Sequence, residues 1–304
     1  MTEQPPTSFF YKHEDHAGNH ADVLKHLLLV NVLQELQKVH PEGLMVADAH
    51  SGYGVYALDS QEGKWKQGIG KVLQRYCSTT KKYEIPAPIR TYIQTVLETV
   101  GAENYDDFEL YPGSPLLTQT LLRPGIDEHR CTDCYMQQVE GLHNPANFQP
   151  LDCYDPATLN FLMPRDNSDK HNVILLDGGF GHDEEYAAVQ ALLERILDRN
   201  PYATVLVWIP FVQGHKFRWS FATRLRALAQ EKAKVGRYYA NIVIRKTGLQ
   251  GSAMLICNPT PLLDDVIDPN TLHWLAHVLH QGKDEYTVEQ IMKKKKNKQP
   301  LEEE

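Results

Sequence analysis

Residues 44–54 read LMVADAHSGYG, a short apolar run that ends in an aspartate and continues into a loop with two glycines. An unbroken apolar run of this length predicts a strand that is buried on both faces of a sheet. Two further runs of the same kind lie at 173–177 and 204–209. Helical patterns separate the three runs, so the sequence predicts an α/β fold with a mixed, mostly parallel sheet and helices on both faces.

The regions between these runs favour helices. We expect long helices in three places, at 22–38, 183–198 and 216–233. Between 57 and 110 the alternation of strands and helices breaks down, and apolar residues at helical spacing predict a small helical insertion after the first strand. At 112–115 the sequence PGSP predicts a turn into another helix, with Ser114 as its N-cap and Pro115 at its first position.

The C-terminal part of the chain has a different pattern. Residues 240–244 and 252–257 predict two antiparallel edge strands joined by a connection that contains glycine. The charged segment 286–304 predicts a disordered tail. We therefore expect one main domain from 1–56 and 111–285, interrupted by the helical insertion at 57–110.

Composition excludes several classes of protein. The net charge of −8 argues against a protein that coats nucleic acid indiscriminately, although positive charge can still be concentrated locally. No apolar run reaches the roughly 20 residues that span a membrane, and no signal peptide is recognisable. The five cysteines form an odd set without a disulfide pattern, which favours a reducing, cytoplasmic location.

A block of polar residues precedes the first predicted strand. Residues 16–26 read HAGNHADVLKH and concentrate three histidines, an aspartate and a lysine directly before the apolar run at 27–30. Asn19 or Asp22 can cap the helix that starts here, and its first N–H groups are available to a ligand. The block is either part of a binding site or a solvated cap with incidental histidines, and we favour the site because titratable groups crowd there.

Acidic residues lie where the predicted strands end. Asp48 closes the first strand, and the glycines after it allow the backbone to approach a ligand, although such a loop can also be a plain tight turn. Asp133 would end a second strand and is placed to bind a ribose diol. Asp152 would close a third strand near an adenine edge, and Asp177 a fourth. Because open α/β sheets bind ligands beyond the carboxyl ends of their strands, we expect a nucleoside cofactor here. S-adenosylmethionine fits better than a dinucleotide, since no Gly-x-Gly-x-x-Gly motif is present.

With these features the chain resembles the J-type 23S ribosomal RNA adenine-N6 methyltransferase family. The resemblance is specific at residues 16–26, at 48–56 and in YPGSP at 111–115, and it extends to Trp208-Ile209-Pro210 and Asn258-Pro259. It implies a class I, Rossmann-like methyltransferase domain with a helical insertion after the first strand. The implied cofactor is S-adenosylmethionine. The implied partner is 23S rRNA, free or at an early stage of assembly, with no membrane and no metal involved.

The resemblance also implies roles for individual residues. The family's cofactor contacts correspond here to His26, His50, Ser114, Asp133, Asp152, Cys153 and Asp177. Asp177 would be the catalytic acid. Tyr11 would be the N-terminal aromatic that touches the RNA. Beside it, Lys12 suits a phosphate contact, although simple packing of this N-terminal arm is an equal alternative.

One motif departs from the family pattern. The family has Asp-Pro-Pro-Tyr where this chain has Asp177-Gly178-Gly179-Phe180. In the family motif the acid and the next carbonyl accept hydrogen bonds from the adenine amine, and the aromatic ring stacks on the base. Asp177 and Phe180 keep these groups, but two glycines must be ordered at an entropic cost. Three hypotheses follow: an rRNA adenine-N6 methyltransferase, a catalytically weakened protein that binds cofactor and RNA, and a DNA adenine methyltransferase.

Other sites are weaker candidates. The spacing of His13, His16 and His20 could suit a metal, and Cys131-x-x-Cys134 is half of a zinc motif. No second cysteine pair lies nearby, so no metal site is predicted. Trp208 is expected in the core of the sheet.

Overall fold

A computed structural model describes residues 16–58, 63–165, 169–214, 218–280 and 286–294. Its centre is an eight-stranded sheet with the strand order β10-β8-β9-β7-β6-β1-β4-β5. The strands are β1 (Leu44–Asp48), β4 (Glu128–Thr132), β5 (Phe148–Gln149), β6 (His171–Leu176), β7 (Thr204–Val212), β8 (Gly236–Val243), β9 (Leu249–Cys257) and β10 (Thr287–Lys294). In the sheet order, β5, β4, β1, β6 and β7 pair in parallel, each with the next. Strand β9 lies between β7 and β8 and is antiparallel to both. The predicted mixed, mostly parallel α/β sheet is confirmed.

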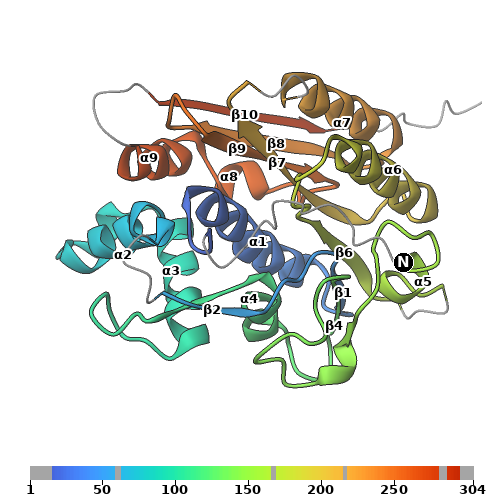
Figure 1. The fold of residues 1–304 in the computed structure, drawn as a ribbon, viewed down its shortest axis with the longest axis horizontal. Coiled ribbons are helices and arrows are strands. Elements are labelled where there is room, and N and C mark those ends of the chain that lie inside the picture. Colours follow the sequence, from blue (N-terminus) through green and yellow to red (C-terminus); the bar gives the residue numbers. More distant parts are fainter. Residues whose placement is uncertain (1–15, 59–62, 166–168, 215–217, 281–285, 295–304) are drawn as a thin grey trace, which may run out of the picture.

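Helices cover both faces of this sheet (Figure 1). They are α1 (His20–Val39), α2 (Ile69–Ser78), α3 (Ala87–Val100), α4 (Ser114–Leu121), α5 (Leu159–Leu162), α6 (Asp183–Arg199), α7 (Arg218–Lys232), α8 (Leu263–Val266) and α9 (Pro269–Leu279), with short 3-10 turns at Lys64–Gln67, Lys82–Glu84 and Pro145–Asn147. The predicted long helices at 22–38, 183–198 and 216–233 are confirmed within a few residues. The predicted helical insertion is also confirmed, because helices α2 and α3 follow the first strand. They lie between β2 (Val55–Ala57) and β3 (Leu110–Pro112), which form a separate two-stranded sheet.

The sheet has a hydrophobic core on each face because successive strand residues point to opposite sides. On one face, Val46 and Leu175 pack in a cluster with apolar residues of α1, α3 and α9. On the other face, Ala47 and Ile174 pack with α5, α6 and α7. Unbroken apolar runs are required in the central strands since neither face meets water.

Two expectations about the C-terminal part are wrong. The strands predicted at 240–244 and 252–257 are not at the edge, because β8 and β9 are both paired on either side. The segment 286–304 is not disordered throughout, because β10 pairs antiparallel with β8. Local polar contacts support this strand: Asn241 Nδ2 donates to the Glu289 carboxylate at 2.8 Å, and Gln290 Nε2 donates to the Ile267 carbonyl at 2.7 Å. The prediction rested on the lysine-rich composition, which is typical of a tail but is also compatible with a half-exposed edge strand.

No helix in the described part of the chain is both long and apolar enough to cross a membrane.

Candidate active site

Helix α1 begins at His20 within the polar block at 16–26, and residues 17–26 of the block are buried. Asn19 is the N-cap, and its Oδ1 accepts hydrogen bonds from the backbone N–H groups of Ala21 at 2.7 Å and Asp22 at 3.1 Å. The Asp22 carboxylate reaches back to accept from Gly18 N at 2.9 Å. His20 and Lys25 are only 5% and 3% exposed. The block is therefore not a solvated cap.

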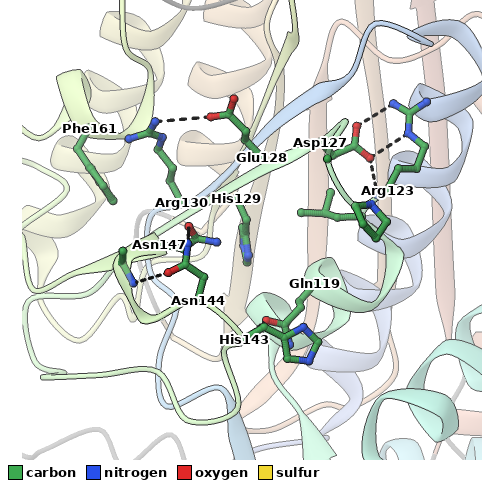
Figure 2. A pocket seen from close by; sticks show the side chains of 14 residues that line it. Gln119, Arg123, Asp127, Glu128, His129, Arg130, His143, Asn144, Asn147 and Phe161 are labelled. Atoms are coloured by element: carbon green, nitrogen blue, oxygen red, sulfur yellow. Dashed lines mark hydrogen bonds and ion pairs between the residues drawn. The ribbon is translucent and has the colours of Figure 1, made fainter.

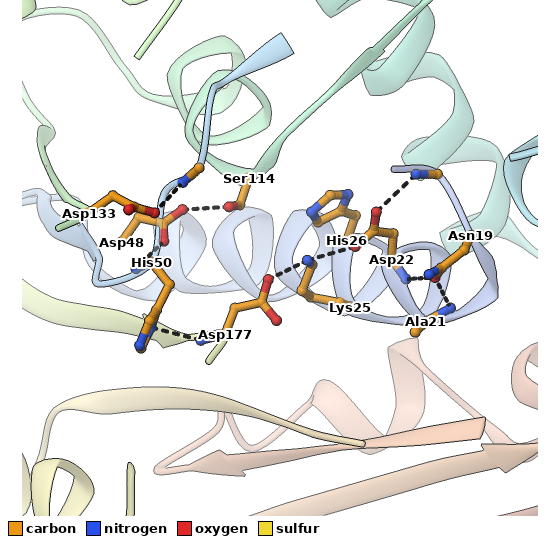
Figure 3. A network of polar contacts seen from close by, with 12 residues as sticks. Asn19, Ala21, Asp22, Lys25, His26, Asp48, His50, Ser114, Asp133 and Asp177 are labelled. Atoms are coloured by element: carbon orange, nitrogen blue, oxygen red, sulfur yellow. Dashed lines mark hydrogen bonds and ion pairs between the residues drawn. The ribbon is translucent and has the colours of Figure 1, made fainter. Parts of the chain in front are cut away.

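Lys25 joins this helix to the end of β6. Its ammonium donates to Asp22 Oδ1 at 2.7 Å and to Asp177 Oδ2, directly after the strand (Figure 3). Burial alone would lower the pKa of Lys25, but the carboxylates of Asp177 and Asp22 outweigh it and hold the pKa above its ordinary value. The ammonium therefore stays charged and fixes one oxygen of Asp177.

His26 lies one residue further along α1. Its Nδ1 is 2.7 Å from the hydroxyl of Tyr111, a fully buried residue of β3. The two rings stack with their centroids 5.6 Å apart. These contacts fix the imidazole beside the Lys25 network (Figure 3).

Asp48, the last residue of β1, lies on the same edge of the sheet. Its carboxylate accepts from the Ser114 hydroxyl and, at 3.2 Å, from His50 N. Burial raises the pKa of Asp48 to about 6, against the opposing effect of the Ser114 hydrogen bond. The prediction that Ser114 caps α4 is wrong, because Gly113 is the N-cap and no side chain caps this helix. The Ser114 hydroxyl is instead taken by the more strongly accepting carboxylate.

Asp133 holds the glycine loop. In the register of the sheet Asp48 lies beside Cys131 of β4, so Asp133 comes just beyond the strand end. Its Oδ2 accepts from Gly52 N at 3.0 Å, and its Oδ1 accepts from Tyr135 N at 2.9 Å. Gly52 has a φ of +62°, which favours glycine. Each oxygen of Asp133 keeps a lone pair for a further donor.

His50 connects the loop to the segment after β5. Its Nε2 is 3.0 Å from the Tyr154 hydroxyl and 3.2 Å from Cys153 Sγ, and its Nδ1 accepts from Asp177 N at 3.3 Å. Burial lowers the pKa of His50, which favours the neutral ring that can accept this hydrogen bond. Asp152 is exposed and accepts from Tyr154 N at 2.9 Å. It does not close a strand as predicted, because β5 already ends at Gln149.

Phe180 is held by an aromatic cluster. Its ring centroid lies 4.7 Å from that of Tyr186, 5.6 Å from Phe221 and 5.8 Å from Trp208. Its φ of +50° is uncommon for a residue with a side chain. Trp208 lies in the buried core, as predicted. A base could stack only on the part of the half-buried Phe180 ring that these neighbours leave exposed.

The structure therefore brings His26, His50, Ser114, Asp133, Cys153 and Asp177 to one edge of the sheet, with Asp152 nearby on the surface. Sequence reasoning missed two residues that also contact this network. They are Tyr154, after β5, and Glu185, in α6. Tyr154 directly follows the Asp152-Cys153 pair, whereas Glu185 follows the glycine motif only in the first turn of the next helix. Tyr11 and Lys12, with His13, lie outside the described residues.

The described residues include no group of three or more His, Cys, Asp or Glu side chains that could hold a metal ion. Cys131 is buried with its Sγ 3.2 Å from His129 Nε2, whereas Cys134 is exposed. A separate cavity of about 530 Å³ is lined by Arg123, Glu128, His129 and Arg130 (Figure 2). It lies toward the amino end of β4, opposite to the end where Asp133 follows.

Comparisons with known proteins agree with the motifs. A family model described as ribosomal RNA large subunit methyltransferase D, RlmJ, matches residues 41–292. The chain belongs to this family. A Haemophilus influenzae protein named ribosomal RNA large subunit methyltransferase J is similar to it, with 28% identity over 92% of this chain and 98% of the relative. An Escherichia coli protein of the same name is 26% identical over 87% of this chain and 92% of the relative.

A solved structure shows the same fold. The crystal structure of a Legionella pneumophila protein superposes with a TM-score of 0.73 and 22% identity, covering 90% of this chain and 98% of that one. Together with membership of the RlmJ family, this confirms the predicted class I methyltransferase fold.

Proposed function

We propose that this member of the RlmJ family transfers the methyl group of S-adenosylmethionine to N6 of an adenine in 23S rRNA. The observation that carries the proposal is the position of Asp177. It follows β6, next to the glycine loop after β1, and Lys25 holds one of its oxygens. An acid acceptor thus lies at the edge of the sheet where class I folds bind their ligands.

The residues present suit the cofactor. Asp133 has two carboxylate oxygens with lone pairs for the ribose hydroxyls, and the loop that it holds turns through glycines. His26, His50, Ser114, Cys153 and the exposed Asp152 would complete its surroundings. S-adenosylmethionine supplies a methyl group activated by its sulfonium. No metal is needed in this proposal.

Asp177 would act on the adenine amine. The lone pair of an exocyclic amine is delocalised into the ring, so an acceptor for its N–H increases its nucleophilicity. Lys25 engages Oδ2 of Asp177 and orients the carboxylate so that Oδ1 can accept from the amine. By resemblance to the family motif, the Gly178 carbonyl would be the second acceptor. Accurate placement of the amine against the methyl group is then the main contribution of the protein.

RNA recognition must be local because the net charge is negative. Lys64 and Lys66 lie on the 3-10 turn after β2, whereas the Lys71 ammonium donates to the Leu279 and His280 carbonyls. Contacts of Tyr11 and Lys12 with RNA remain a prediction, in which one stacks on a base and the other neutralises a phosphate. We expect deproteinised RNA, free or from early assembly, to be the substrate.

The decisive experiment is methyl transfer to deproteinised 23S rRNA by the parent protein and by Asp177→Ala. We expect a loss of about 100-fold or more, because the variant lacks the acceptor for the reacting amine. The melting temperature of the variant is the control that it is folded. Transfer at the parent rate would show that Asp177 is not the catalytic residue.

A matched single-stranded DNA substrate separates the alternatives. Faster transfer to DNA would indicate a DNA adenine methyltransferase. RNA and cofactor binding without transfer by the parent protein would indicate the catalytically weakened protein.

A further inference from the structure

The Glu185 carboxylate, in the first turn of α6, contacts the glycine loop after β6. Its Oε1 accepts from Gly179 N at 2.9 Å, and its Oε2 accepts from Gly181 N at 3.2 Å. Oε1 also accepts from the Tyr154 hydroxyl at 3.0 Å. One side chain therefore engages two peptide groups of a loop in which three of the first four residues after Asp177 are glycines.

These hydrogen bonds fix the direction of a carbonyl. The Gly178 C=O and the Gly179 N–H belong to one planar peptide unit, and the described part of the chain has no cis peptide bond. In a trans unit the two groups point in opposite directions. By holding the Gly179 N–H, Glu185 directs the Gly178 carbonyl away from α6. Free glycines would sample many orientations of this unit.

A second route links Glu185 to Asp177. The Tyr154 hydroxyl donates to Glu185, and the same hydroxyl is 3.0 Å from His50 Nε2. His50 Nδ1 in turn accepts from Asp177 N. Burial and then Glu185 raise the pKa of Tyr154, so the phenol keeps the proton that it donates. Both ends of the Asp177–Gly179 segment are thus tied to one network.

The glycine at 178 leaves room for this arrangement. A Cβ built there would lie 2.9 Å from Glu185 Oε1 and 3.1 Å from the Tyr154 hydroxyl. A Cβ at Gly179 would meet nothing within 4 Å, and Gly179 is not in the left-handed region. At 179 the loop therefore tolerates a side chain but needs the N–H group.

Glu185 also supports Phe180. The peptide group after Phe180 is held through Gly181 N, directly beside the residue whose φ is +50°. A strained conformation persists only where its surroundings determine it.

We infer that Glu185 is a positioning residue for methyl transfer, which orders the Asp177–Gly181 loop in place of the two prolines of the related motif. The inference rests on the proposed function, in which Asp177 and the Gly178 carbonyl face the reacting amine. Glu185 acts through the loop and does not touch the substrate.

The first test compares Glu185→Ala with Glu184→Ala. Glu184 is exposed in the same helical turn, so both variants remove the same charge at the same helix end. We expect Glu185→Ala to lower kcat by about 10- to 100-fold while KM for RNA and Kd for S-adenosylmethionine change less than about threefold. Glu185→Gln, which keeps one acceptor oxygen, should recover part of the loss. Glu184→Ala should behave like the parent.

The second test uses the N–H group alone. Gly179→Ala keeps it and Gly179→Pro removes it, so only the proline variant should lose kcat. In the Glu185→Ala background the proline should have no further effect, because the acceptor is already gone. An equal effect of Gly179→Pro in both backgrounds would mean that proline acts by strain, and it would overturn the inference.

Amide hydrogen exchange of peptides spanning 178–181 provides a readout without substrate. Exchange should be at least about tenfold faster in Glu185→Ala than in Glu184→Ala. Faster exchange together with lost kcat supports the inference. Unchanged exchange in Glu185→Ala overturns it. So does an unchanged kcat in Glu185→Ala when Asp177→Ala is inactive, and that result leaves the proposed function intact. If the parent protein transfers no methyl group, the proposed function fails and the positioning role fails with it. Hydrogen exchange would then show only whether Glu185 orders the loop.

Discussion

Lys25 sets the charge balance of the site at the scale of single residues. It is buried between two carboxylates, Asp22 and Asp177, that lie far apart in the sequence. A buried ion pair contributes little by itself, but removing one partner leaves a buried charge without compensation. The lysine therefore links the fold of α1 to the geometry of Asp177.

This role predicts a large effect of Lys25→Met on stability. We expect the free energy of unfolding to fall by about 3–5 kcal/mol, because the buried carboxylate of Asp22 and the partly buried carboxylate of Asp177 lose their counterion. Chemical denaturation measures the change. Lys81→Met is the control, since Lys81 forms a pair with Glu84 that is exposed on both sides, and its loss should cost less than about 1 kcal/mol. Similar losses in both variants would contradict the role of Lys25.

Asp133 should determine cofactor binding. S-adenosylmethionine should raise the melting temperature of the parent by mass action, and Asp133→Ala should remove most of that increase. Asp155→Ala serves as the control, because Asp155 is an exposed acid whose carboxylate accepts from Ala157 N. Thermal unfolding with and without cofactor measures both variants. An undiminished increase in Asp133→Ala would remove Asp133 from the site.

Strand β10 shows how one element can be missed. Its sequence lacks the unbroken apolar run of the central strands, and its charged residues are exposed. Residues 287–294 form a strand because all eight of them pair with residues of β8. Where the two strands meet, Gly236 has a φ of +155°, and a Cβ there would lie 2.4 Å from the Lys293 carbonyl oxygen.

We therefore expect Gly236→Ala to loosen the β8–β10 pair. The clash with backbone and the unfavourable φ should together lower the free energy of unfolding by about 1–3 kcal/mol. Gly248→Ala is the control, because its φ of +65° carries strain but its Cβ meets nothing within 4 Å. In urea denaturation, Gly236→Ala should have a lower free energy of unfolding than Gly248→Ala. The reverse order would show that β10 contributes little to the sheet.

Buried histidines contribute to the pH dependence of the stability of the whole molecule. Burial and then Arg245 lower the pKa of His20 to about 3, and burial lowers that of His129 to about 4. Unfolding releases both to their ordinary value of 6.5, so the unfolded chain binds more protons between pH 4 and 6.5. Their contribution to stability is complete above pH 6.5 and is lost as the pH falls. Asp48 acts in the opposite direction, because its raised pKa favours the folded, protonated form below pH 6.

We expect the free energy of unfolding to be lower at pH 5 than at pH 7.5, with His129 contributing on the order of 2 kcal/mol. His129→Gln should reduce this difference. His143→Gln, at an exposed position, should leave it unchanged. Urea denaturation at both pH values measures the effect. An equal pH dependence in His129→Gln and the parent would mean that His129 is not neutral in the folded protein.

The sequence by itself determined the central strands, the long helices, the insertion and the family. Each depends on patterns within about ten residues, such as the apolar run before Asp48 or the block that starts α1. The same local reading placed Asp133 and Asp177 at strand ends, because a strand and the residue after it are neighbours in the chain.

Only the tertiary structure decided which side chains meet. Lys25 reaches Asp177 across 152 positions, the Ser114 hydroxyl turns to Asp48 instead of capping α4, and Glu185 engages the glycine loop. These contacts depend on sheet register and on the side of the sheet that each helix covers, which no local pattern encodes. The glycines at 178 and 179 remove the rigidity of the family's prolines, and the loop is ordered instead by a carboxylate of the next helix, which accepts from Gly179 N and Gly181 N.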